Sequence, residues 1–295
     1  MDCYHMVRIS SKVAASFPLP GPEITDMRIV VCVKEVLDPD AVGAYALAGK
    51  LEIGDDSKSL TQTTIPRLMN AYDEQAIEAA LRLRDGGADA TVCAVSVGDD
   101  LTTMLRHAKS LGVDEVVAIA PPAGADGHVV AALLAAFVRD RGADLVLFGR
   151  QASDDDQGVV PALVGEALAM AVVTVARQVE LAGAAVRVTR VTPDGDEVVE
   201  ADLPAVVTVS SELGEPRYPT VPMRMQARKV TPDQVDPGEL PVGAEDLAPL
   251  VVLERQWVPE VKGECEFLAG ETAAELADAL VGRLVADKTL KTGGA

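Results

Sequence analysis

The feature that most constrains this chain is an alternation, repeated four times, of a short apolar run with a longer segment of helical periodicity. The apolar runs are residues 28–33, 91–96, 116–120 and 145–149, and the helical segments after them are residues 70–84, 99–111, 129–139 and a helix that begins close to Pro161. Runs that are apolar almost throughout, such as RIVVCV at residues 28–33, suit strands of a parallel sheet covered by helices. Four successive strand–helix units therefore predict a doubly wound α/β fold with a mostly parallel, Rossmann-like sheet.

A different pattern begins after residue 171. Further strands, separated by turn residues that contain glycine, are predicted at residues 172–181, 185–192 and 197–201. Residues 205–209 (AVVTV) then return to the pattern of a buried strand. The sequence thus predicts a β-hairpin addition to the parallel sheet.

The two ends of the chain differ from its middle. Residues 1–26 carry three prolines and no continuous apolar core, so they predict a disordered extension rather than a signal peptide, and Met27 is a candidate start. Residues 210–236 are rich in proline and glycine, which predicts a long loop, and a helix is expected at about residues 271–285. We therefore expect one α/β domain over residues 27–230, followed by a C-terminal arm over residues 231–295.

Charge and cysteine usage exclude several classes of protein. The net charge of -20 disfavours nucleic-acid partners, which need clustered Lys and Arg to neutralise phosphates. The four cysteines have no CxxC spacing, so we expect no zinc or iron–sulfur site and reduced thiols in a cytoplasmic protein. No uninterrupted apolar stretch of about 18 residues occurs, so no membrane span is expected.

The best candidate ligand site is the segment GRQASDDDQGVVP at residues 149–161. Ligands of open parallel sheets bind beyond the carboxyl ends of the strands, and this segment joins such an end to a helix whose free N–H groups would favour a phosphate. The alternative is an acidic turn that only caps the helix. Neither GxGxxG nor GxxxxGK[ST] is present, so the phosphate hypothesis depends on position.

Other chemistry has weaker support. Consecutive carboxylates at Asp154, Asp155 and Asp156 cannot all face one magnesium ion, and no histidine lies nearby in the sequence. No GxSxG elbow pairs with a histidine for nucleophilic catalysis. We therefore expect no metal site and no catalytic residue.

Five sequence blocks resemble the electron transfer flavoprotein beta subunit. They are VCVKEVLDP at 31–39, NAYDEQAIEAALRLRD at 70–85, AVSVG at 94–98, GRQASDDDQG at 149–158 and LPAVVTVSSELGEPRYPTVPMRMQARK at 203–229. The blocks follow the family order, and the last one is the most specific. In the second block Ala71 stands where the family has proline.

The resemblance implies an adenine-nucleotide-binding fold and an electron carrier rather than an enzyme. It implies a heterodimer with an alpha subunit that holds most of the FAD, and AMP, or a second FAD in the electron-bifurcating branch, in this subunit. By position, the nucleotide contacts would be Cys32, Asn70, Ala71, Tyr72, Asp73, Val97, Gly149, Arg150, Gln151, Ala152, Ser153, Asp154, Asp156, Gln157, Gly158, Val159 and Val160. Tyr72 matches an aromatic residue that approaches the flavin of the alpha subunit, or else it only packs at the helix start.

The resemblance also implies a recognition loop at about residues 210–230 that docks on dehydrogenases, with a quinone oxidoreductase or similar protein as the electron acceptor. Its anchor would be Val221, followed by Pro222 and Met223, where the family usually has leucine and proline. The final helix would dock on the alpha subunit. Two further departures from the family are Val159-Val160-Pro161 in place of Gln-Thr-Gly, and Val191 in place of a glutamate.

Two other classes of function fit part of the sequence. A nucleotide-binding regulatory protein of universal-stress type shares the doubly wound sheet, but it would not explain the C-terminal part. A magnesium-dependent nucleotide-hydrolysing enzyme would use Asp154 to Asp156. The first predicts a self-sufficient homodimer, and the second predicts turnover of ATP.

Overall fold

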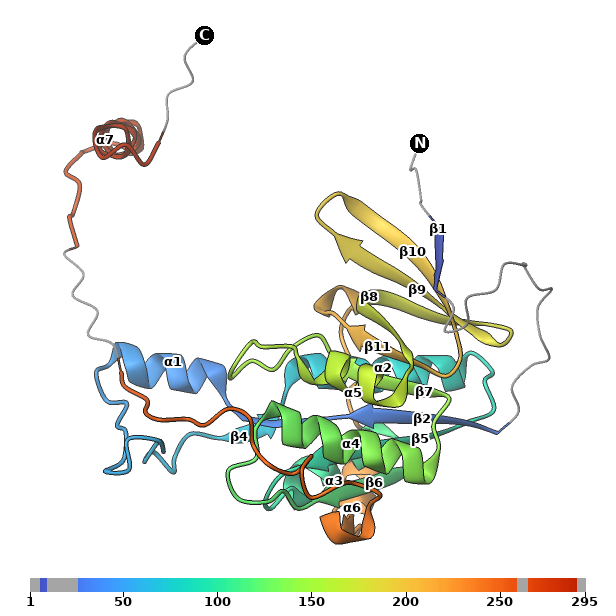
Figure 1. Cartoon of the computed structure of the whole chain (residues 1–295). Helices are drawn as coiled ribbons and strands as arrows, with labels where there is room; N and C mark the ends of the chain where they lie inside the picture. Colours follow the sequence, from blue (N-terminus) through green and yellow to red (C-terminus); the bar gives the residue numbers. More distant parts are fainter. Residues whose placement is uncertain (1–5, 10–25, 259–264, 291–295) are drawn as a thin grey trace. The chain divides into compact units, whose positions relative to one another are not determined.

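The computed structural model describes residues 6–9, 26–258 and 265–290 (Figure 1). The chain divides into a large unit, Met1–Gln256, and a small unit, Trp257–Ala295.

A ten-stranded sheet forms the centre of the described part of the large unit. In spatial order its strands are β1 (Met6–Ile9), β10 (Gly195–Asp202), β9 (Ala185–Thr192), β8 (Ala171–Ala182), β11 (Ala205–Val209), β7 (Leu145–Gly149), β2 (Met27–Cys32), β5 (Ala90–Val97), β6 (Glu115–Ile119) and β12 (Asp233–Val235). Neighbouring strands are parallel except for β10 with β9 and β9 with β8. The predicted mostly parallel α/β fold with a β-hairpin addition is confirmed.

Helices cover both faces of the parallel strands. The helices α2 (Ala71–Asp85) and α3 (Thr102–Leu111) cover one face, and α4 (Gly127–Arg141) and α5 (Val160–Leu168) cover the other, nearer face in Figure 1. Side chains of β2 alternate between the faces: Ile29 belongs to the buried cluster of α2 and α3, whereas Val30 belongs to that of α4 and α5. Burial on both faces explains why β2 is apolar almost throughout.

Several segments that were expected to be irregular contain short elements. The polar connection between β2 and α2 holds α1 (Pro39–Leu47) and a two-stranded sheet of β3 (Glu35–Leu37) and β4 (Arg67–Met69). The prediction of an irregular loop over residues 210–236 is wrong in part, because this segment contains the short 3-10 helix η1 (Ser211–Leu213), α6 (Val221–Ala227) and β12. A second 3-10 helix, η2 (Pro237–Glu239), lies just beyond it. The seven residues of α6 are too few to reveal a helical period.

Strand β1 lies inside the segment expected to be disordered, and it pairs in parallel with β10. The rest of that segment, apart from Asp26, lies outside the described residues. In the small unit, helix α7 (Ala273–Ala286) occupies the position predicted for the final helix, with the Thr272 hydroxyl accepting a hydrogen bond from the Glu275 N–H at 3.2 Å. Within the described residues, no helix combines the length and the apolar character needed to cross a bilayer.

Candidate functional site

The candidate site lies where the strand order reverses. The chain builds β2, β5 and β6 in one direction and then returns to place β7 on the other side of β2. The residues after β7 therefore emerge at the switch point between β7 and β2, where ligands of open α/β sheets bind. Residues 149–160, here called the strand-end loop, join β7 to α5 at this point.

Asn70, the residue before α2, holds the strand-end loop. Its Nδ2 donates to the Gln151 carbonyl oxygen at 2.9 Å, and its Oδ1 accepts from the Ser153 N–H at 3.2 Å. The side chain is buried, and it makes no capping hydrogen bond to α2. The amide that would ordinarily cap the helix instead fixes the loop.

Asp73, in the first turn of α2, binds the ends of two strands. Its Oδ1 accepts from the Gly149 N–H at 3.0 Å, and its Oδ2 accepts from the Lys34 N–H at 2.8 Å. The residue is 6% exposed. Burial raises the pKa of Asp73 to about 7, although hydrogen bonds from Lys34, Asn70 and Gly149 act in the opposite direction.

Two glycines let the strand-end loop take this path. A Cβ on Gly149 would lie 2.4 Å from Asp73 Oδ1 and 2.6 Å from the Cβ of Tyr72, so no side chain fits there. Gly158 has a φ of +61°, and its Cβ would lie 2.9 Å from the carbonyl oxygen of Arg150. Gly149 is therefore required by the close approach of Asp73 and Tyr72, and Gly158 by that of the Arg150 backbone.

The acidic run of the loop is held by its neighbours. Lys34 Nζ lies 2.7 Å from Asp154 Oδ1 and 3.2 Å from Asp155 Oδ2, and Gln151 Nε2 donates to Asp156 Oδ1 at 2.8 Å. Burial lowers the pKa of Lys34, but the hydrogen bond and the charge of Asp154, followed by those of Asp155, raise it above its ordinary value. Across the described ranges, no group of three or more His, Cys, Asp or Glu side chains is placed to hold a metal ion.

The start of α5 leaves N–H groups for a ligand. Val159 stands at the N-cap position and provides no side-chain hydrogen bond to the first turn. A Cβ on Gly127, at the start of α4, would lie 3.5 Å from Val159 Cγ2, so the two helix starts are neighbours. Uncapped N–H groups at the start of α5, together with the close approach of the Gly158 and Arg150 backbones, fit a phosphate carried by a nucleotide.

The other predicted contacts lie around the same edge of the sheet. Cys32 and Val97 stand at the carboxyl ends of β2 and β5, which are neighbouring strands. Burial, followed by the charge of Asp73, raises the pKa of the Cys32 thiol well above its ordinary value, which makes it an unreactive packing group. The Arg150 guanidinium lies 5.6 Å from the centre of the Tyr72 ring. The structure thus brings the predicted residues together, and their contact with a nucleotide stays a prediction.

Two contributors, Lys34 and Asp155, were not among the predicted nucleotide contacts. Lys34 follows β2 by two residues, and no local pattern links it to an acidic loop more than 100 residues later. The available signal was the position of residue 34 at the end of the strand predicted at residues 28–33. Residue 34 also lies within the first of the five blocks.

The residues predicted to recognise partners lie on α6. Val221 is 63% exposed and Pro222 follows it in the first turn, while the Cε of Met223 comes near Gly112 at the end of α3. Met225 and Tyr218 are also exposed, and Arg224 lies over the Tyr218 ring at 5.3 Å. The sequence did not single out these last three side chains, because their exposure depends on α6.

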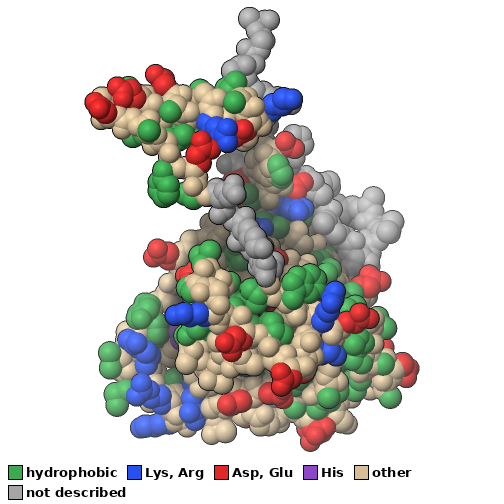
Figure 2. All heavy atoms as spheres, turned by 90° about the vertical axis from the view of Figure 1, so that its left-hand side faces the viewer, with side chains coloured by type: hydrophobic (Ala, Val, Ile, Leu, Met, Phe, Trp, Pro, Cys, Tyr) green, Lys and Arg blue, Asp and Glu red, His purple; other side chains and the backbone are tan. Residues whose placement is uncertain are grey.

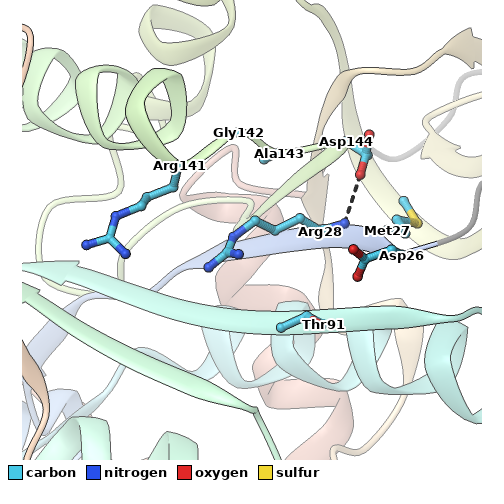
Figure 3. A pocket seen from close by; sticks show the side chains of 8 residues that line it. All are labelled: Asp26, Met27, Arg28, Thr91, Arg141, Gly142, Ala143 and Asp144. Carbon is cyan, nitrogen blue, oxygen red and sulfur yellow. Dashed lines mark hydrogen bonds between the residues drawn. The ribbon is translucent and has the colours of Figure 1, made fainter.

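A separate hollow of about 450 Å³ opens at the opposite edge of the sheet (Figure 3). It is lined by Asp26, Met27, Arg28, Thr91, Arg141, Gly142, Ala143 and Asp144. The Arg28 N–H donates to Asp144 Oδ2 at 2.8 Å, and the Arg28 guanidinium pairs with Glu115. This hollow lies at the amino ends of β2, β5 and β7, so we do not assign the ligand to it.

A doubly wound, mostly parallel sheet with a loop at its switch point defines the class of open α/β proteins whose ligands bind beyond the strand ends. Comparison with known proteins narrows that class. The model of the electron transfer flavoprotein domain matches residues 59–240.

Named relatives cover most of the chain. It is 34% identical to the human electron transfer flavoprotein subunit beta over 224 residues, which is 74% of this chain and 85% of the relative. It is 32% identical to the caffeyl-CoA reductase-Etf complex subunit CarD of Acetobacterium woodii over 265 residues, or 88% and 98% of the two chains. The chain belongs to the electron transfer flavoprotein family, within its beta subunits.

Proposed function

We propose that this chain pairs with an FAD-holding alpha subunit, holds an adenine nucleotide in the strand-end loop and carries electrons from dehydrogenases to a downstream acceptor in the cytoplasm. The observation that carries the proposal is the strand-end loop itself, fixed at the switch point by Asn70 and Asp73. AMP is the nucleotide that we expect. Cys32, Cys93 and Cys265 are free thiols, as a reducing compartment requires.

Within this proposal the side chains orient and hold rather than react. Uncapped N–H groups at the start of α5 would receive the phosphate, and Cys32 and Val97 would line the adjoining strand ends. The bound flavin would supply the redox chemistry. The role of this chain is therefore to shape the electrostatic surroundings of the cofactor and to present it to partners.

Exposed apolar side chains support a role in an assembly. Four consecutive residues, Leu250 to Leu253, are each at least 51% exposed. Figure 2 shows one face of the molecule, on which hydrophobic side chains lie among charges of both signs. In the small unit, Leu276, Leu280 and Val281 on α7 are exposed as well. We assign the arm to docking on the alpha subunit and α6 to docking on dehydrogenases and acceptors such as a quinone oxidoreductase.

A second FAD in place of AMP is the second candidate. A relative whose name places it in a caffeyl-CoA reductase-Etf complex matches 88% of this chain, which favours a role in a larger complex.

Co-expression with the alpha subunit tests both candidates. The expected result is a yellow 1:1 complex that releases one FAD and one AMP when it is denatured. Release of two FAD and no AMP would show that this subunit holds a second FAD in place of AMP. A colourless, stable monomer would contradict the proposed function. Turnover of ATP by the purified chain, lost in Asp156→Asn, would instead favour a hydrolase.

A further inference from the structure

Asp73 joins three elements that meet at the candidate site. Its two carboxylate oxygens accept from Gly149, the last residue of β7, and from Lys34, just beyond β2, while the residue itself belongs to α2. Strands β7 and β2 are neighbours on the two sides of the switch point. One side chain therefore sets the spacing of the two strand ends from which the site is built.

The surroundings of this carboxylate are unusual for a charged group. The titratable or charged groups that face it are the Cys32 thiol and the Lys34 ammonium from the end of β2, and Lys34 is itself paired with Asp154 and Asp155 of the loop. Just before α2, the Asn70 amide lies beside it. The hydrogen bonds that the described residues give to Asp73 thus come from two backbone N–H groups and this amide, and the nearest ammonium is shared with other carboxylates.

The charge state of Asp73 decides whether both strand ends are held. An ionised carboxylate is a strong acceptor on both oxygens, but a protonated one keeps full acceptor strength only on its carbonyl oxygen and accepts weakly on its hydroxyl oxygen. Gly149 packs closely against the start of α2, because a Cβ there would lie 2.4 Å from Asp73 Oδ1 and 2.6 Å from the Cβ of Tyr72. Proton uptake by Asp73 therefore weakens its hydrogen bond to the end of β2 or to the end of β7. Because the strand-end loop continues directly from β7, a weaker hold on β7 also loosens the loop.

We propose that Asp73 is a positioning residue that holds the strand-end loop in its ligand-binding shape only while its carboxylate is ionised, so that nucleotide affinity rises with pH near neutrality. This inference rests on the proposed binding of an adenine nucleotide. Because burial raises the pKa of Asp73 to about 7, the change falls between about pH 6 and pH 8.

Equilibrium dialysis of AMP against the nucleotide-stripped heterodimer tests the proposal between about pH 6 and pH 8. The wild-type complex should bind AMP several-fold more tightly at the upper pH. Asp73→Asn should bind about tenfold more weakly there, since hydrogen bonds to a charged group are lost, and it should keep only the pH dependence that comes from the AMP phosphate. The matched control is Asp144→Asn, which removes a carboxylate that accepts from the Arg28 N–H at the amino end of β2 and should keep wild-type affinity and pH dependence.

A second measurement on the wild type does not depend on the folding of a variant. Amide hydrogen exchange at Gly149, corrected for the intrinsic rate, should be less protected at about pH 6 than at pH 8, while Val146 in the middle of β7 should not change. A pH-independent AMP affinity in the wild type, or Asp73→Asn with full affinity and an unchanged pH profile, would overturn the inference alone. A wild-type complex that binds no adenine nucleotide at any pH would overturn the proposed function as well.

Discussion

Glu78 on α2 receives three hydrogen bonds from Arg217, from its backbone N–H at 3.1 Å, from Nε at 2.7 Å and from Nη2 at 3.4 Å. Arg217 also pairs with Asp85 at 2.8 Å. Residue 217 lies four residues before α6, so this carboxylate fixes the approach of the chain to the exposed residues of α6. Burial opposes ionisation of Glu78, but hydrogen bonds from Arg217 and Arg82 lower its pKa below the ordinary value.

Glu78→Gln should lower stability by about 1–3 kcal/mol, because a hydrogen bond to a charged group is lost at a mostly buried position. Thermal unfolding measures this change, and reduction of the complex by a dehydrogenase should show a higher KM. Glu197→Gln, at an ion pair of the hairpin, is the control and should leave the KM unchanged. An unchanged KM in Glu78→Gln would show that the contact between Glu78 and Arg217 has no effect on docking of the dehydrogenase.

Gly149→Ala should destabilise the chain by about 1–3 kcal/mol and abolish nucleotide retention, because the added methyl would overlap Asp73 and Tyr72. Gly43→Ala in α1 is the control, since nothing lies within 4 Å of its Cβ and alanine favours helices. Urea unfolding and the nucleotide content after purification check both variants. Equal stability of the two would show that α2 can shift away from β7.

Asn70→Asp should keep the acceptor for the Ser153 N–H but lose the donor to the Gln151 carbonyl, and it would add a negative charge beside a phosphate site. We expect nucleotide affinity to fall about tenfold. Isothermal titration with AMP measures it. Gln62→Glu, which changes an amide that donates to the Lys50 carbonyl elsewhere, should not alter AMP binding.

Stability should fall as pH rises from about 4 to 7 through the contribution of Asp73. Its folded-state pKa of about 7 lies above the unfolded value, so its contribution is fully present below the unfolded pKa and is lost as pH rises through the folded one. The loss is on the order of 4 kcal/mol at most. Urea unfolding at a series of pH values, with Asp73→Asn for subtraction, measures it, and parallel profiles would show that Asp73 does not titrate in this range.

Val221→Leu adds one methylene to a side chain that is 63% exposed on α6. If α6 docks on a dehydrogenase, burial of the methylene should tighten binding by about 0.8 kcal/mol, or about fourfold. Val221→Ala should weaken it. Surface plasmon resonance of the heterodimer on an immobilised dehydrogenase checks the direction, and no effect of either variant would place the contact elsewhere.

The central sheet could be predicted because burial on two faces leaves a local signature in each strand, as in residues 28–33. The position of the strand-end loop followed from the same pattern, since strand ends define where ligands bind. By contrast, α6 is too short to show a period, and β12 has three residues. Their formation depends on packing against elements that are distant in sequence.

Details of the site depend on pairs that no local pattern encodes. Lys34 with Asp154, and Glu78 with Arg217, are separated by 120 and 139 residues. The sequence placed Asp73 among the ligand contacts, but its hydrogen bonds to two strand ends became visible only when the switch point brought those ends together.

The two glycines of the strand-end loop also bear on how such a protein can be redesigned. Gly149 is fixed by the close approach of Asp73 and Tyr72, and Gly158 by that of the Arg150 carbonyl oxygen, whereas acidic side chains between them are held by Lys34 and Gln151. A graft that exchanges residues 150–157 between family members, with both glycines and Asn70 retained, would therefore transfer ligand preference without rebuilding the sheet.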